Sequence, residues 1–315
     1  MPRVDHGVPF FVVKCHSPNR RIALTVTLLC ALTACNKLGL GGNDPSPTAP
    51  SGPPPSASVA SMVYSAIGAS DANGIGSSVP CLPFAACGNG MGYVPVTVRQ
   101  LSAQGFKITL RNLGLPTAVI GRDFQDLGRQ YGRTIEGNFI EDEMPFVLQE
   151  STIVTIFAGI NEINTITAAL GGGAGGNDRN AYIDNQVSAF GADYTTLING
   201  IRSRAAGTRF VVLNVPNAAG MPFLANASLA QRQAAQRAAV LMTTRVINPL
   251  ASPLVTVVDV MCDSRSYQRS NYSSDGLHPN DAGYANIAAE IVRGITTVAA
   301  YPTPKGSCAP MTLVP

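Results

Sequence analysis

The stretch Ile153-Val-Thr-Ile-Phe-Ala-Gly159 is an unbroken apolar run that leads directly into Ile160-Asn161-Glu162. A strand of this kind is typical of a parallel sheet, whose strands are buried on both faces by helices. Similar apolar runs, with helical sequence between several of them, occupy residues 59–68, 106–114, 210–215 and 254–260. This alternation predicts an α/β protein built on a doubly wound parallel sheet.

Helices and loops complete the pattern. Ser228-Leu-Ala-Gln231 has the form of a capping box and begins a helical run that extends to about residue 247. Further helices are expected over residues 94–103 and from Asp281 to about Val298, where Tyr284, Ile287, Ile291 and Ile295 form a core stripe. Long loops that could line a site are expected at residues 77–92, 122–150, 170–180 and 218–227.

Polar residues follow the ends of the predicted strands. Ser70 comes just after the first strand and Asn161 just after the third. Open α/β sheets bind their ligands at the carboxyl ends of the strands, so these side chains are expected to lie at one edge of the sheet. Ser70 is therefore a candidate nucleophile, although a serine in this position is also a common turn or cap residue.

The segment Asp275-Gly-Leu-His278-Pro279 precedes the last helix. The chain has three histidines, and the other two, His6 and His16, lie near its start. Imidazole is the side chain that transfers protons near neutral pH, and Asp275 can reach the same ring. The alternative is an Asp-rich turn that caps the last helix. Together with Ser70, the segment favours a serine that is activated by histidine.

Four blocks, in this order, resemble the conserved blocks of the SGNH (GDSL-type) hydrolases: Gly68-Ala-Ser70, Asn112-Leu-Gly114, Gly159-Ile-Asn161-Glu162 and Asp275-Gly-Leu-His278-Pro279. The resemblance covers nearly the whole expected domain. It implies a flavodoxin-like three-layer α/β/α sandwich and an esterase or lipase that uses no metal and no organic cofactor. An α/β-hydrolase is set aside, because the stretch around Ser70 lacks the second glycine of Gly-x-Ser-x-Gly.

The resemblance also implies residue roles. Ser70 would be the nucleophile, His278 the base, and Asp275 the carboxylate that orients the base. The oxyanion of the tetrahedral intermediate would be bound by the N–H of Ser70, the side-chain amide of Asn161 and a backbone N–H after the second strand. That third donor would belong to Gly114 or Thr117.

The chain departs from the family pattern at three positions. Ala69 stands where the family has an aspartate, Thr117 where it has a glycine, and Glu162 where it has an aspartate. We expect Glu162 to be harmless and Thr117 to serve through its N–H if the turn keeps its shape. The first two departures support the alternative of a catalytically inactive, surface-binding protein. An acyltransferase or a carbohydrate O-acetylesterase is a further alternative.

The first 34 residues have the pattern of an export signal, in which Lys14, Arg20 and Arg21 precede a short uncharged run. That run ends in Leu32-Thr-Ala-Cys35, which resembles the lipobox of bacterial lipoproteins, so we expect Cys35 to carry a lipid. An ordinary signal peptide with a chance cysteine is the alternative.

Residues 35–58 are rich in Gly, Pro, Ser and Thr, which predicts a disordered tether. Residues 59–315 would then form one domain, exported and held by its lipid on a bacterial membrane.

Charge and composition constrain the partners. The formal charge of +3 resides in residues 1–34, and the remainder is neutral, with no basic run and no tryptophan. This pattern does not predict nucleic-acid binding. We expect a monomer that acts on an ester-bearing small molecule, a lipid or an acylated carbohydrate.

Four cysteines belong to the expected domain, and an even number in an exported domain favours disulfides. Of the three possible pairings we expect Cys81 with Cys87, closing a loop, and Cys262 with Cys308, tying the C-terminal segment to the end of a strand. A structural zinc site is disfavoured, because no Cys-x-x-Cys pair is present and the one histidine is needed elsewhere.

Overall fold

The computed structural model describes residues 60–85 and 87–315. The expected signal peptide over residues 1–34, the lipidation of Cys35 and the tether over residues 35–58 lie outside the described residues. In the part of the chain that is described, no helix combines the length and the hydropathy that a membrane crossing requires.

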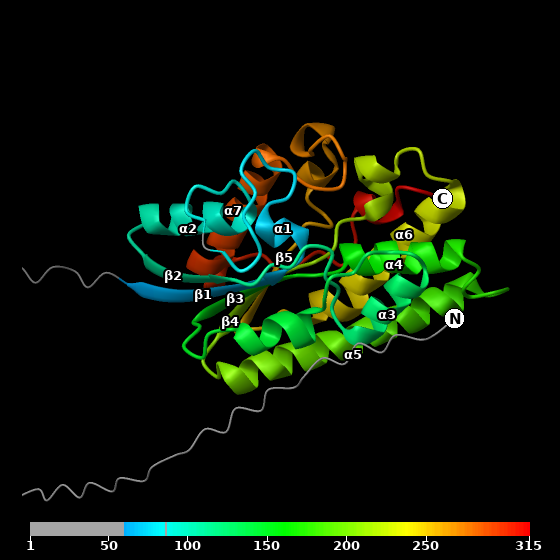
Figure 1. The fold of residues 1–315 in the computed structure, drawn as a ribbon. Helices are drawn as coiled ribbons and strands as arrows, with labels where there is room; N and C mark the ends of the chain where they lie inside the picture. Colours follow the sequence, from blue (N-terminus) through cyan, green and yellow to red (C-terminus); the bar gives the residue numbers. More distant parts are fainter. Residues whose placement is uncertain (1–59, 86) are drawn as a thin grey trace, which may run out of the picture. The chain divides into compact units, whose positions relative to one another are not determined.

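A five-stranded parallel sheet forms the centre of the fold (Figure 1). Its spatial order is β2-β1-β3-β4-β5, which is the flavodoxin-like order expected from the sequence. Each strand lies within one of the predicted apolar runs or begins one residue before it. The strands are β1 (Ser61–Gly68), β2 (Lys107–Asn112), β3 (Ile153–Phe157), β4 (Arg209–Leu213) and β5 (Val255–Val258).

Helices cover both faces of the sheet, so the three-layer α/β/α sandwich is confirmed. On one face, α2 (Tyr93–Ala103) and α7 (Asp281–Thr296) pack against each other (Figure 1). The other face is covered by α3 (Arg122–Gln130), α4 (Ile160–Gly171), α5 (Arg179–Arg204) and α6 (Leu229–Leu241). A single turn, α1 (Ser70–Asn73), follows β1.

Side-chain alternation along the strands produces a separate core on each face. In β4, Phe210 and Val212 are buried on the side of α3 to α6, whereas Val211 and Leu213 are buried on the side of α2 and α7. Successive side chains of a strand point to opposite faces, and here both faces are covered. The strands therefore have continuous apolar sequences rather than alternating ones.

Two segments differ from the sequence-based expectation. Residues 122–150, expected to be a loop, contain α3, which buries Phe124, Gln125 and Gly128. The sequence of this helix is mostly polar and contains a glycine, so its local helical propensity is weak. Its packing against the rest of the fold therefore decides that it is helical. The helix after Ser228 ends at Leu241 and continues as a wider π-helical turn over Met242–Ile247.

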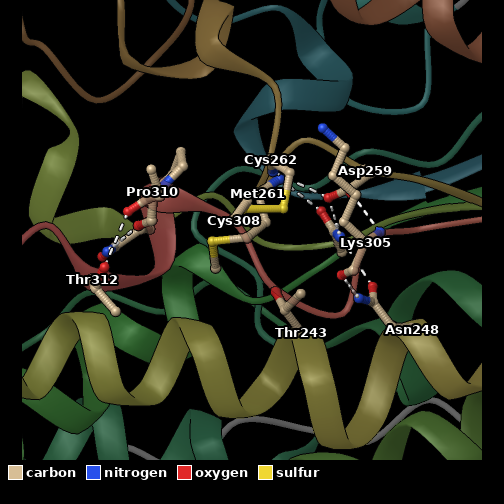
Figure 2. The surroundings of a disulfide bond; sticks show 12 residues. Thr243, Asn248, Asp259, Met261, Cys262, Lys305, Cys308, Pro310 and Thr312 are labelled. Carbon is tan, nitrogen blue, oxygen red and sulfur yellow. Dashed lines mark hydrogen bonds between the residues drawn. A yellow bond between two sulfur atoms is a disulfide. The ribbon is translucent and has the colours of Figure 1, made fainter.

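Both expected disulfides are present. Cys81 pairs with Cys87, and Cys262 pairs with Cys308, each with a Cα–Cα distance of 5.8 Å. Figure 2 shows the second bond, which joins the segment after β5 to the C-terminal segment. Nearby, the backbone N–H of Lys305 donates to Oδ2 of Asp259 at 2.9 Å, which fastens the same segment a second time (Figure 2).

Candidate active site

Ser70 is the first residue of α1, in a turn that is fixed from several sides. The N–H of Gly68 donates to the buried carboxylate of Glu143 at 2.9 Å. The side-chain amide of Asn112, at the end of β2, donates to the carbonyl of Ala72 at 2.9 Å. Ser70 lines a pocket at the carboxyl ends of β1 and β3, the edge of the sheet at which the sequence predicted a site.

The segment Asp275-Gly-Leu-His278 forms a tight turn around its own carboxylate. Oδ1 of Asp275 accepts the N–H of Leu277 at 2.8 Å, the N–H of His278 at 2.9 Å and the hydroxyl of Ser273 at 2.8 Å. Gly276 has φ = +71°, which glycine adopts without steric cost. Aspartate commonly makes such bonds to the backbone that follows it. The three-residue spacing in the sequence therefore belongs to a turn that sets the carboxylate beside the imidazole.

A continuous line of hydrogen bonds joins three of the predicted site residues. Oδ2 of Asp275 lies 2.7 Å from Nδ1 of His278, and Nε2 of His278 lies 2.8 Å from Oγ of Ser70. The side chain of His278 is 16% exposed. When Nδ1–H donates to the carboxylate, Nε2 is the nitrogen that can accept the hydroxyl proton of Ser70.

The hydrogen bonds around Asp275 keep its carboxyl ionised. Partial burial acts to raise its pKa. The hydrogen bonds from the ring and N–H of His278, the hydroxyl of Ser273 and the N–H of Leu277 outweigh burial and lower the pKa to about 2. An ionised carboxylate in this position would stabilise an imidazolium on His278.

Gly76 and Tyr284, which were not expected at the site, lie where the loop after Ser70 meets the turn that carries His278. Gly76 has φ = +92°, and a Cβ atom there would lie 2.7 Å from Cβ of His278. Tyr284, expected only as part of the core stripe of α7, donates its hydroxyl to the carbonyl of Ile75 at 2.7 Å. A glycine shortly after Ser70 is a weak signal for such close packing, and the sequence gives no signal for Tyr284.

Asn161 lies in the first turn of α4 and lines the same pocket as Ser70 and His278. Its Nδ2 donates to the carbonyl of Ala118 at 2.9 Å. A side-chain amide has two N–H donors, so this contact uses one of them. The arrangement allows the second donor to act on a group bound in the pocket.

Glu162, which was expected only to be harmless, connects the turn after β3 with the segment after β2. Its carboxylate is buried and accepts the N–H of Gly159 at 2.8 Å and the N–H of Ile120 at 2.5 Å. Burial raises the pKa of Glu162 to about 7, although these hydrogen bonds and the charge of Arg133 act to lower it. The turn between β3 and α4 is thereby joined to the segment that follows β2.

Gly114 and Thr117, the two candidates for the backbone donor after β2, differ in their surroundings. The N–H of Gly114 donates to Oδ1 of Asn112 at 3.2 Å. Thr117 has φ = +63°, which is strained for a β-branched residue, and its hydroxyl accepts the N–H of Glu136 at 3.0 Å. Within residues 60–85 and 87–315, no hydrogen bond uses the N–H of Thr117. The turn therefore keeps a glycine-like backbone although a threonine occupies it.

A second cavity adjoins the site pocket. The two share the walls formed by Asp71, Phe157, Ile160 and Leu277. Burial raises the pKa of Asp71, while the charge of His278 and a hydrogen bond from Tyr284 act to lower it. The rest of the second cavity is mixed: Pro216, Met221, Val260 and Ile287 are apolar, whereas Asp263, Arg265 and Glu290 are charged.

Comparisons with known proteins bear on the family and the fold. A sequence profile of the GDSL-like lipase/acylhydrolase family matches residues 66–285. The sequence matches no curated protein.

Among solved structures, a lipase from a goat rumen metagenome has a TM-score of 0.51 at 15% identity, and the match covers 76% of this chain and 98% of that one. An extracellular lipase from Streptomyces rimosus has a TM-score of 0.48 at 16% identity, with 73% of this chain and 98% of the lipase covered. A family 3 carbohydrate esterase from Clostridium thermocellum has a TM-score of 0.43 at 16% identity, with 76% and 98% covered. At these identities the similarity to the goat rumen lipase shows a shared fold and nothing further.

Proposed function

Because the chain belongs to the GDSL-like lipase/acylhydrolase family, we propose that it cleaves carboxylic esters through an acyl intermediate on Ser70. In this proposal His278 is the general base and Asp275 orients it. The observation that carries the proposal is the line of contacts from Asp275 through His278 to Ser70, at 2.7 and 2.8 Å. An uncharged hydroxyl is a weak nucleophile at neutral pH, so a base in contact with it is what this chemistry requires.

The reaction proceeds in two halves. Oγ of Ser70 attacks the ester carbonyl carbon while Nε2 of His278 takes the hydroxyl proton, and the carbonyl electron pair moves onto oxygen. The tetrahedral intermediate then collapses, the C–O bond to the alcohol breaks, and His278 gives its proton to the leaving alkoxide. Water attacks the acyl-serine in the same way, with His278 again as base, and releases the acid and the free hydroxyl of Ser70.

Three donors would bind the oxyanion in both halves: the N–H of Ser70, the second N–H of the Asn161 side chain and the N–H of Thr117. We favour Thr117 over Gly114, because the N–H of Gly114 already donates to Asn112. The left-handed backbone of Thr117 supports this assignment, since it matches the conformation that a glycine would supply.

The cavity next to the site bears on the substrate class. The partly apolar cavity that adjoins the pocket of Ser70 supports binding of an acyl group there. An ester-bearing small molecule, a lipid or an acylated carbohydrate would satisfy this requirement. An acyltransferase would use the same acyl-serine but discharge it to a sugar hydroxyl instead of water.

We also propose that the protein is exported and lipid-anchored through Cys35 on a bacterial membrane. The pattern of residues 1–35 supports this, and so do the two disulfides, which form and persist in oxidising compartments. A monomer suffices for the chemistry, since one chain supplies Ser70, His278, Asp275 and Asn161.

Ester hydrolysis by the wild type and by Ser70→Ala tests the function. The substrates are p-nitrophenyl esters of increasing chain length and an acetylated polysaccharide, each with and without a sugar acceptor. Turnover by the wild type that is lost in Ser70→Ala supports the proposal, and an acylated acceptor would assign transfer instead. A wild type that turns over no ester while remaining folded would favour the inactive binding protein.

A further inference from the structure

We propose that Arg133 is a positioning residue that holds the Asn161 side chain with its amide donor toward the oxyanion. The inference rests on the proposed function. Arg133 lies in the segment between α3 and β3, outside all four blocks that carry the family resemblance.

The guanidinium of Arg133 contacts both the main chain and the side chain of Asn161. Nη1 donates to the main-chain carbonyl of Asn161, and Nη2 lies 3.4 Å from Oδ1 of the same residue. Nη1 also donates to the hydroxyl of Thr165 at 2.7 Å, and that hydroxyl donates to the carbonyl of Asn161 at 2.9 Å. The first turn of α4 is therefore held at the point where Asn161 enters the pocket.

These contacts decide which way the amide of Asn161 faces. Arginine has donors and no acceptor, so Oδ1 is the favoured neighbour of its guanidinium. On the other side, the carbonyl of Ala118 accepts from Nδ2 at 2.9 Å. If the amide of Asn161 were flipped, its NH2 group would face the guanidinium of Arg133 and its oxygen would face the carbonyl of Ala118. The flipped side chain would also turn its oxygen, an acceptor, toward the negatively charged oxygen of the intermediate. Arg133 thus favours the orientation that presents a donor.

The carboxyl of Glu162 belongs to the electrostatic surroundings of Arg133. Burial lowers the pKa of Arg133, and the carboxyl of Glu162 acts to raise it. Glu162 is itself fixed by the N–H groups of Gly159 and Ile120. Arg133 therefore contacts Asn161 directly, while Glu162 fixes the turn before Asn161 and the segment that carries Ala118.

Arg129 provides a matched control. Its Nε and Nη2 donate to the main-chain carbonyl of Ile135 at 3.2 and 2.8 Å. It therefore anchors the segment that carries Arg133 without contacting Asn161. A general weakening of this segment would affect Arg129→Gln and Arg133→Gln alike, whereas loss of amide orientation would affect Arg133→Gln alone.

The test compares kcat and KM for p-nitrophenyl acetate among six proteins: wild type, Arg133→Gln, Arg133→Lys, Arg129→Gln, Asn161→Ala and the double variant Arg133→Gln/Asn161→Ala. Loss of a whole oxyanion donor costs about 10²- to 10³-fold in kcat, so a misoriented donor should cost about tenfold or more. We expect this loss in Arg133→Gln with little change in KM, partial recovery in Arg133→Lys, and a change of less than about twofold in Arg129→Gln.

The double variant gives the most specific result. If Arg133 acts through Asn161, Arg133→Gln should lower kcat by less than about twofold further once Asn161 is alanine. Three outcomes would overturn the inference. The double variant could lose kcat by the product of the two single losses, Arg129→Gln and Arg133→Gln could lose kcat equally, or Arg133→Gln could keep the wild-type kcat. Should Arg133→Gln fail to fold, Arg133→Lys decides, because lysine keeps the charge but lacks the fork of donors: a lowered kcat supports the inference and a wild-type kcat overturns it.

Labelling of wild-type Ser70 by a fluorophosphonate tests the proposed function separately from the positioning role of Arg133. Labelling combined with unaltered kinetics in Arg133→Gln overturns the positioning role and leaves the proposed function standing. A wild type that neither reacts with the probe nor turns over the ester overturns the proposed function and the inference together.

Discussion

Oγ of Ser70 lies 2.8 Å from Nε2 of His278, although 208 positions separate the two residues in the chain. The end of β1 fixes the position of Ser70, and the turn that precedes α7 fixes the position of His278. The parallel sheet directs both to the same edge, where Gly76 lets the two loops meet without a side chain between them.

Gly76→Ala should lower kcat by about tenfold or more, because the new methyl group would displace His278 from Ser70 by a fraction of an ångström or more. Gly105→Ala is the matched control, since Gly105 has φ = +91° and no atom within 4 Å of the added Cβ. Both changes should cost about 1–2 kcal/mol of unfolding free energy through the backbone alone. Measured kcat and urea unfolding check this; an equal effect of both variants on kcat would contradict the account.

Asp275→Asn should lower kcat by about 10³- to 10⁴-fold, because asparagine no longer selects the tautomer in which Nε2 accepts the proton of Ser70. The fold should persist, since the turn around position 275 keeps an acceptor oxygen for the N–H groups of Leu277 and His278. Steady-state kinetics together with circular dichroism test the prediction. A kcat within tenfold of the wild type would remove Asp275 from the mechanism.

The same carboxyl should make stability depend on pH at the acid end. Its pKa is about 2 in the folded protein, below the unfolded value of about 3.9. The contribution of the ionised carboxylate is therefore complete above about pH 5 and is lost as the pH falls toward 2. The difference in unfolding free energy between wild type and Asp275→Asn should be larger at pH 5 than at pH 2, with the decrease falling between about pH 4 and pH 2. A difference that grows on acidification would contradict this.

Thr117→Gly should leave kcat within about threefold of the wild type, because it keeps the N–H and relaxes a backbone with φ = +63°. The relief of strain, of order 1 kcal/mol, is offset by the lost hydrogen bond to the N–H of Glu136. Thr117→Pro removes the N–H and also fixes φ near −65° in place of +63°, so both changes should lower kcat, by about a hundredfold or more together. Comparable activity in the glycine and proline variants would exclude Thr117 as an oxyanion donor.

Removing the Cys262–Cys308 disulfide should cost more stability than removing Cys81–Cys87. The two bonds span 46 and 6 positions, and the chain-entropy relation gives roughly 4 and 2 kcal/mol for loops of these lengths. Paired cysteine-to-serine variants, compared by urea unfolding, test the order. A larger loss for the short loop would show that local strain or packing outweighs the entropy of the unfolded chain.

The sheet could be predicted because its strands are apolar on both faces, so strands such as β3 and β4 appear as unbroken runs. The boundaries were less well defined, since apolar sequence continues past the last paired residue. The helix α3 could not be predicted, because its few apolar residues give little local signal and its packing against the rest of the fold decides its structure.

The site residues likewise fall into those that could be predicted from the sequence and those that could not. Ser70 and Asn161 could be predicted from their places after strands, and Asp275 and His278 from a turn that is local in sequence. The contacts of Gly76, Tyr284 and Arg133 join positions that are distant in the chain, and no motif around these residues announces them. Glu162 was expected to be neutral, because only the fold shows that its carboxylate reaches the N–H of Ile120.

The reactivity of Ser70 toward a fluorophosphonate tests the central claim most directly. Intact mass and peptide mapping would follow the labelling of wild type, Ser70→Ala and His278→Ala. We predict one label per wild-type chain, located on Ser70, none in Ser70→Ala, and a rate at least about a thousandfold lower in His278→Ala. Labelling of the wild type at a different residue, or equal rates in wild type and His278→Ala, would contradict the proposal that His278 activates Ser70.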